Sequence, residues 1–383
     1  MIVRRAAAGL ALALGFGAIA LAAPSPAHAA VTSAGDWATL QALVTGAADG
    51  DVIVLVGGTI ANPPGSNLEV PPGVTLTIDL HGTHLVVDAS ASPGAAVDVS
   101  DATSGIVIRD VDGGGAGRLT AIGSPGAAGI GGSAMSFAGT IVILGGTIEA
   151  TGGDGGAGIG GGQGDASAPF GGVREVRIEG GTVTARGGAG AAGIGGGSAS
   201  IGTVSLPVTI SGGSVTAFGG AGAGGVWSNA AGIGGGGSEF VTGDGGSGFA
   251  VTISGGSVMA VGGDASYGGW LGAGIGAGDG NPVTATPGTL TLCGNAEPAS
   301  TATDGGAEAG SNLAAPIVAC PSYHWYTAVS SPGRLSVVFG DPTAAAPALP
   351  ATGSEPAAAL AFAGVILLAG AAALRLGARR RRD

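Results

Sequence analysis

The stretch that decides the fold runs from Gly180 to Gly197 and has the sequence GGTVTARGGAGAAGIGGG. Half of this stretch is glycine, and Arg186 is its only charged side chain. A flexible glycine-rich linker has no reason to place β-branched residues at fixed points. Valine and isoleucine recur here in phase with the glycines, because the same phrases return along the chain. The glycines are therefore expected to serve a regular structure.

Two phrases repeat through the middle of the chain. The tetrapeptide Ala-Gly-Ile-Gly begins at Ala128, Ala157, Ala192, Ala231 and Ala273. The phrase Gly-Gly-[Thr/Ser]-[Ile/Val]-x-Ala precedes the last four copies and begins at Gly145, Gly180, Gly212 and Gly255. Self-similarity at periods of 20 to 50 residues is typical of solenoids. The repeats, at about residues 116–280, predict a stack of similar turns.

Each repeat contains three short apolar-alternating pieces separated by glycine. Three strands joined by tight corners describe one turn of a parallel β-helix, with valine and isoleucine facing inward and threonine, serine, glutamate or arginine facing outward. Glycine suits the corners because it adopts positive φ angles freely. The sequence predicts an all-β parallel β-helix, or solenoid, over residues 31–289.

The segment before the repeats supports this fold. Asp36 is predicted to cap a short helix from Trp37 to about Val44. The phrases GDVIVL, LTIDLHGTHL and GIVIRD follow, beginning at Gly50, Leu76 and Gly105. In this order after a capping helix, they resemble the opening rungs of right-handed β-helix proteins of the pectin-lyase-like superfamily. The resemblance covers about residues 35–290 and implies a right-handed helix.

The superfamily includes polysaccharide lyases and glycoside hydrolases, so catalysis has to be weighed. A lyase of this type needs an arginine or lysine base beside carboxylates that hold Ca²⁺, and a hydrolase needs convergent carboxylates. The chain has no lysine and none of the polygalacturonase-type phrases. We predict a non-enzymatic protein, and a wall-bound polysaccharide lyase or glycoside hydrolase is the alternative.

The densest polar group is the one place where a catalytic site could form. Strand alternation would put Asp110 and Asp112 on one face, with Asp79 or Asp88 from a nearby rung as a further carboxylate. The alternative is that both aspartates are turn residues before Gly113.

Neither a metal site nor a cofactor site is predicted. His81 and His84 lie three apart in one expected strand, so they would face opposite sides and could not share a metal ion.

The N-terminal 30 residues have the three parts of a secretory signal peptide. Two arginines within Met1–Arg5 precede an apolar run at 6–23, and small residues then lead to Ala29 and Ala30. This pattern predicts cleavage after Ala29 or Ala30. The alternative is an uncleaved membrane anchor, because 18 apolar residues can span a bilayer.

The last 35 residues carry a second three-part signal. The pentapeptide Leu349–Pro350–Ala351–Thr352–Gly353 precedes an apolar span at 357–374 and an arginine tail at 379–382. This arrangement resembles the LPxTG sorting signal of Gram-positive surface proteins. The resemblance implies that a sortase cuts between Thr352 and Gly353 and joins Thr352 to peptidoglycan, after a short Pro/Ala linker at 341–348. A plain transmembrane anchor is the alternative. Helices are expected for both terminal signals.

Charge and cysteine content agree with a secreted protein. Residues 31–352 hold six arginines against 23 acidic residues, which leaves a net charge of −17. Such a surface argues against nucleic acid or anionic lipid as a partner. Cys293 and Cys320 would meet an oxidising exterior, so they are expected to form a disulfide that ties a small C-terminal β-module at 290–340.

Three aromatic residues are candidates for ligand binding. Trp227 precedes the fourth Ala-Gly-Ile-Gly copy, and Tyr267 and Trp270 precede the fifth. On stacked rungs these side chains would leave the same corner and could form a stacking platform for sugar rings, or they could pack against one another. The predicted function is a non-catalytic β-helix for display, adhesion or glycan binding, with an extracellular polysaccharide or a host or neighbouring cell surface as partner.

Overall fold

The computed structural model describes most of the region between the two terminal signals. The described residues are 29–164, 171–199, 207–222, 228–238, 246–264, 271–279, 286–296, 300, 302, 304–306 and 314–340, without the side chains of 321–325. Both terminal signals, with their expected helices, lie outside these ranges. No helix in the described part of the chain is long and apolar enough to cross a membrane.

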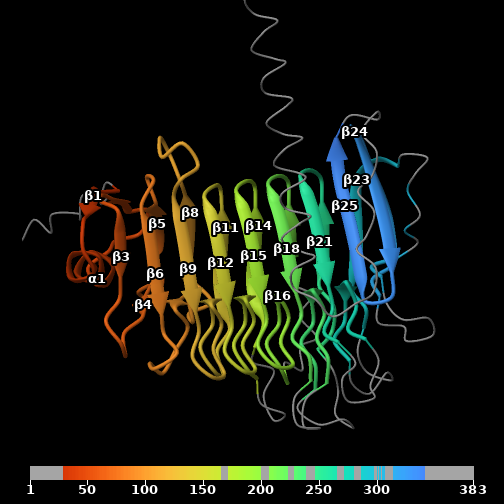
Figure 1. Ribbon diagram of the computed structural model, residues 1–383, viewed down its shortest axis with the longest axis horizontal. Helices are drawn as coiled ribbons and strands as arrows, with labels where there is room; N and C mark the ends of the chain where they lie inside the picture. The colour runs from red at the N-terminus through yellow and green to blue at the C-terminus, as the bar shows by residue number, and fades with distance from the viewer. Residues whose placement is uncertain are drawn as a thin grey trace, which may run out of the picture.

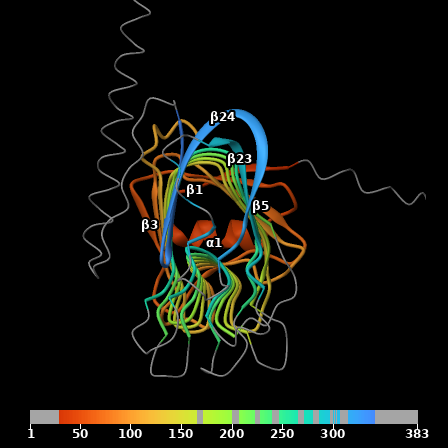
Figure 2. The ribbon, with the colours of Figure 1, turned by 90° about the vertical axis from the view of Figure 1, so that its right-hand side faces the viewer.

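The described chain winds into an elongated stack of short parallel strands (Figure 1). One turn, or rung, contributes one strand to each of three columns. Viewed along the stack, successive rungs superimpose closely (Figure 2). Each strand pairs in parallel with the strand of the same column in the next rung, so equivalent side chains lie above one another at intervals of about 4.8 Å.

The three columns account for the strands before the C-terminal end. The first column contains β1 (Val31–Ala34), β2 (Val52–Leu55), β5 (Thr75–Asp79), β8 (Gly105–Arg109), β11 (Ala138–Ile143), β14 (Val173–Ile178), β17 (Pro207–Ile210), β20 (Ala250–Ile253) and β23 (Thr289–Ala296). The second contains β3 (Thr59–Ala61), β6 (His84–Asp88), β9 (Arg118–Ile122), β12 (Thr147–Thr151), β15 (Thr182–Arg186), β18 (Ser214–Phe218) and β21 (Ser257–Val261). The third contains β4 (Leu68–Glu69), β7 (Val97–Asp98), β10 (Ile130–Gly131), β13 (Ile159–Gly160), β16 (Ile194–Gly195), β19 (Ile233–Gly234) and β22 (Ile275–Gly276).

The core consists of aliphatic side chains stacked in register along each column. Their burial alternates with outward positions, as in β15, where Val183 and Ala185 are buried and their neighbours are not. Each buried valine or isoleucine contributes about 1.5–3 kcal/mol. One stack from each column consists of Ile106, Ile141, Val176, Val208, Val251 and Leu290; of Leu119, Ile148, Val183, Val215 and Val258; and of Val97, Ile130, Ile159, Ile194, Ile233 and Ile275.

The second glycine of each Ala-Gly-Ile-Gly copy forms a ladder in the third column. These glycines are in register and all have φ between 134° and 154°, which disfavours any side chain; they are Gly131, Gly160, Gly195, Gly234 and Gly276. The rungs also approach too closely for a Cβ atom. A Cβ placed on Gly160 would lie 2.0 Å from the carbonyl oxygen of Gly195. The glycines therefore set the backbone conformation and the close rung contacts of this column.

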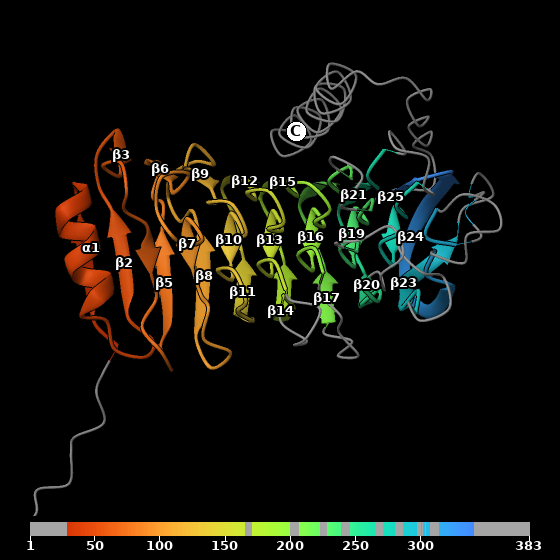
Figure 3. The same ribbon diagram turned by 90° about the horizontal axis from the view of Figure 1, so that it is seen from below.

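A single helix among the described residues, α1 (Trp37–Thr45), closes the N-terminal end (Figure 3). Asp36 is its N-cap, and its carboxylate accepts a hydrogen bond of 2.9 Å from the backbone N–H of Thr39. This bond lowers the pKa of Asp36. Trp37, Leu40 and Val44 form the buried face of α1 and join the core of the stack.

Two further strands, β24 (Ile317–Ser331) and β25 (Arg334–Gly340), form the C-terminal cap. β24 pairs in parallel with β23 and antiparallel with β25, while β25 pairs antiparallel with β21. The parallel second column therefore ends against an antiparallel strand. Tyr326 and Phe339, with ring centroids 5.5 Å apart, contribute to the packing of this cap.

These observations confirm an all-β parallel β-helix with a short N-terminal capping helix. The helix begins at Trp37 and extends one residue beyond the expected end. The expected alternation is also present, because β17, β18 and β20 bury every second side chain.

Candidate functional site

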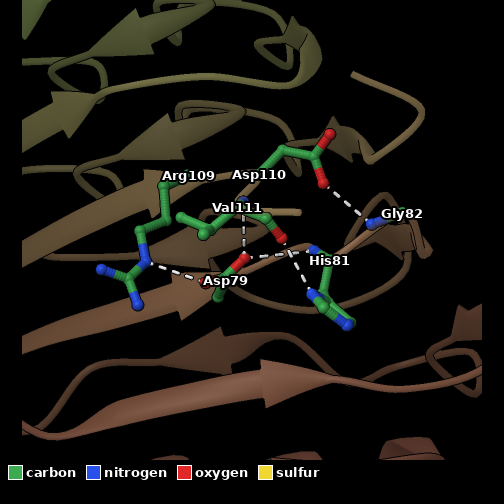
Figure 4. Close-up of polar contacts among 6 residues, drawn as sticks. All are labelled: Asp79, His81, Gly82, Arg109, Asp110 and Val111. Carbon is green, nitrogen blue, oxygen red and sulfur yellow. Dashed lines mark hydrogen bonds and ion pairs between the residues drawn. The ribbon is translucent and has the colours of Figure 1, made fainter. Parts of the chain in front are cut away.

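The polar group expected around Asp110 lies at the corner between the first and second columns (Figure 4). Asp79 ends β5 and is only 3% exposed. Its carboxylate accepts hydrogen bonds from Arg109 Nε at 2.9 Å, from the backbone N–H of Val111 at 3.0 Å and from that of His81 at 3.2 Å. Asp79 thus connects two successive rungs, because it accepts hydrogen bonds from the backbone of its own corner and from that of the next rung.

Asp110 makes the complementary connection between the same two rungs. Its carboxylate accepts a hydrogen bond from the backbone N–H of Gly82 at 2.8 Å and another from that of Gly117 at 3.0 Å. The carboxylate fills the space beside Gly113, where an added Cβ would lie 2.1 Å from Asp110 Oδ1. Both carboxylate oxygens are therefore engaged by backbone donors.

Asp110 and Asp112 are turn residues, and they do not form a carboxylate pair on one face of a strand. β8 ends at Arg109, so strand alternation does not extend to the two aspartates. Asp112 has φ of +58°, a turn conformation that aspartate tolerates better than most residues. Aspartates next to glycines favour turns, so the alternation of a strand does not continue here.

Asp88 ends β6, and its carboxylate is held by its own local turn. Its carboxylate accepts a hydrogen bond of 2.9 Å from the backbone N–H of Ser90. The Ser90 hydroxyl and this N–H lower the pKa of Asp88. A general acid needs a raised pKa, whereas these hydrogen bonds favour the charged form of the Asp88 carboxylate.

One of the two histidines differs from expectation, because His84 begins β6 as expected and His81 does not lie in a strand. His81 is not in a strand: it lies in the turn before β6 with φ of +43°, and its Nδ1 is 2.8 Å from the carbonyl oxygen of Val111. The Nε2 atom of His84 is 3.0 Å from the Thr120 hydroxyl. Burial lowers the pKa of His84. Among the described residues, no group of three or more metal-binding side chains converges.

The candidate stacking residues Trp227, Tyr267 and Trp270 lie outside the described residues. The residues that follow the two tryptophans are described, and they lie on adjacent rungs. Ala230 accepts a hydrogen bond of 2.8 Å from the N–H of Gly263, and Ala273 accepts one of 2.9 Å from Gly232. The described residues that follow Trp227 and Trp270 therefore lie one rung apart.

A contact between an arginine and an aromatic ring, at the end of two second-column strands, was not predicted from the sequence. Arg186 ends β15 and Phe218 ends β18, and the two residues are register partners. The guanidinium carbon lies 4.3 Å from the centroid of the phenyl ring, which is a cation–π contact. The signal was present in the repeats, since Arg186 and Phe218 each directly follow the phrase Gly-Gly-[Thr/Ser]-Val-Thr-Ala.

Cys293 of β23 and Cys320 of β24 form a disulfide between register partners. The bond therefore ties the last strand of the first column to the cap.

Comparison with protein families bears on the anchor and on the fold. A model of the LPXTG cell wall anchor motif matches residues 341–383. A β-helix repeat model matches residues 141–163, 176–198 and 251–279. This chain is a cell-wall-anchored surface protein with β-helix repeats. The second matched stretch of this anchored β-helix protein contains the second half of β14 and all of β15 and β16, so one repeat corresponds to one rung. Comparisons with curated proteins and with solved structures gave no match.

The anchor motif has a chemical consequence for the anchored β-helix protein. An LPXTG motif is the substrate of a sortase, which attaches the protein covalently to peptidoglycan. The protein is therefore secreted and held at the cell wall, with sortase and peptidoglycan as partners.

Proposed function

We propose that this anchored β-helix protein is non-catalytic and presents a glycan-binding surface at the cell exterior. The observation that carries the proposal is the engagement of Asp79 and Asp110. Both carboxylates accept hydrogen bonds from backbone N–H groups of neighbouring rungs. A hydrolase needs two carboxylates directed at one glycosidic bond, whereas these two carboxylates hold the corners of successive rungs together.

The regular outer faces support binding. Parallel strands in register repeat equivalent outward positions from rung to rung, which gives long continuous faces. Such faces suit a polymeric ligand, because many weak contacts add when they belong to one chain. The aromatic residues Trp227, Tyr267 and Trp270 are proposed to contribute stacking beside these faces.

The first test measures catalysis directly. Protein released from the wall by muramidase is expected to liberate no reducing sugar and to produce no ultraviolet-absorbing product from a panel of acidic and neutral polysaccharides. Asp110→Asn should lower the melting temperature, because its backbone donors lose a charged acceptor. Activity in the wild type that disappears in Asp110→Asn or Asp112→Asn, while folding persists, would establish the enzymatic alternative instead.

The second test concerns the aromatic residues. The double variant Trp227→Ala/Trp270→Ala is expected to lose retention in polysaccharide-containing gels by at least tenfold, while its melting temperature changes little. The reason is that stacking on a sugar ring is lost without removal of core packing. Trp325→Ala, in the cap strand β24, serves as a tryptophan control outside this corner. A large fall in melting temperature for the double variant, or retention equal to that of the wild type, would contradict a stacking role.

A further inference from the structure

The outward side of four second-column strands carries two adjacent columns of hydroxyl groups. The strands are β12, β15, β18 and β21. One column is unbroken across all four rungs, and the second lies two residues further along β15 and β18. We call these six side chains the hydroxyl face: Thr147, Thr182, Ser214 and Ser257, with Thr184 and Thr216.

The hydroxyl face is free to bind. All six side chains are half-buried or exposed. Within the described part of the chain, none of their hydroxyls has a hydrogen-bond partner in the protein. The register keeps the hydroxyls about 4.8 Å apart along the stack. They form a regular array of hydroxyls that can hydrogen-bond to water, and a ligand that binds here would displace that water.

An apolar edge borders the hydroxyl face. Phe218, Met259 and Val261 are half-exposed on β18 and β21, and Arg186 lies over the Phe218 ring. A sugar ring likewise combines a polar and an apolar part, because it carries hydroxyls at its rim and C–H groups on its faces. The first column has comparable hydroxyls at Thr209, Thr252 and Thr291, and the three strands that carry them contain no aromatic residue.

The charges favour an uncharged ligand. Glu149, the one acidic side chain on the outward side of these four strands, is paired with Arg118. Arg186 is the remaining charge on this side. The chain between the two signals carries −17 overall, which repels polyanions at low salt.

We propose that the hydroxyl face binds a linear neutral glycan that lies along the axis of the stack. The rise of one rung is close to the length of one sugar in an extended chain, so successive sugars meet equivalent hydroxyls. The apolar edge then contacts the C–H face of the sugars beside β18 and β21. This inference rests on the proposed glycan-binding function and names its ligand class and its surface.

The test removes hydroxyls while keeping the β-branched shape of the side chain. Thr182→Val/Thr216→Val is expected to lower the retention of wall-released protein in gels containing a neutral β-glucan or galactomannan by at least tenfold. Thr209→Val/Thr252→Val, the same change on the first column, should alter retention less than twofold. Melting temperatures should stay close to wild type, since valine is favoured in strands. Wild-type retention should change little between low and high salt, because the contacts are not ionic.

Several results would overturn the inference. Equal losses in the two double variants, or no loss in Thr182→Val/Thr216→Val, would remove the hydroxyl face as the binding surface. Retention of the wild type only by polygalacturonate or alginate, lost at high salt, would replace a neutral ligand with an acidic one. Either result leaves the broader glycan-binding proposal standing. A wild type that no polysaccharide retains would overturn both.

Discussion

Replacing Gly160 with alanine is expected to destabilise the middle of the stack strongly. The residue has φ of +137°, and an added Cβ would lie 2.0 Å from the Gly195 carbonyl oxygen and 2.9 Å from its carbonyl carbon. The obstacle is backbone that is itself held in register by Gly234, so it cannot move alone. Backbone strain together with this clash should cost about 3 kcal/mol or more.

The measurement is thermal unfolding of muramidase-released protein followed by circular dichroism. Gly160→Ala should lower the melting temperature by about 6 °C or more, or abolish secretion. Gly58→Ala is the matched control, because φ there is not positive and no atom lies within 4 Å of an added Cβ. Equal melting temperatures for wild type and Gly160→Ala would show that the glycine ladder is not required.

Replacing Thr352 with alanine is expected to abolish covalent attachment to the wall. We expect the sortase to break the amide bond between Thr352 and Gly353 and to transfer the Thr352 acyl group to an amine of peptidoglycan, with Gly353 leaving as the new amino end of the released segment. Without the recognised threonine, the apolar span at 357–374 is retained on the protein. The variant should therefore move from the muramidase-released fraction to the detergent-extracted membrane fraction.

Thr343→Ala is the matched control for this experiment, since it changes the same residue type nine positions earlier in the linker. It should leave anchoring at the wild-type level. Wild-type protein that detergent alone extracts would contradict sortase attachment, whatever the variants do.

The repeated phrases were sufficient to predict the columns of the fold. Periodic valine and isoleucine identified the inward positions, and Asp36 before an apolar helical face identified α1. The third column was harder to predict from the sequence, because each of its strands is only two residues long, such as Ile-Gly. Sequence reasoning placed the glycines mainly at corners. It did not anticipate that five of them form a ladder within a sheet, since that depends on the distance between rungs.

The polar corner shows where local pattern stops being informative. Alternation continued past Arg109 predicts a carboxylate pair, but Asp110 instead turns to meet Gly82 of the preceding rung. That contact joins residues 28 positions apart, and only the stacking of the rungs brings them together. The hydroxyl face has the same origin, because its six residues come from four repeats and become one surface through register.

The antiparallel cap has a mechanical consequence for a protein fixed at its C-terminal side. The chain leaves the fold from β25, so tension from the wall enters there first. β25 lies between β21 and β24 and is hydrogen-bonded to both. Tension along the strand would have to shear two ladders together, because ladder hydrogen bonds lie perpendicular to antiparallel strands. The Cys293–Cys320 bond passes part of that force covalently to β23. A cell pulled by flow would thus strain the cap before the rungs that carry the hydroxyl face.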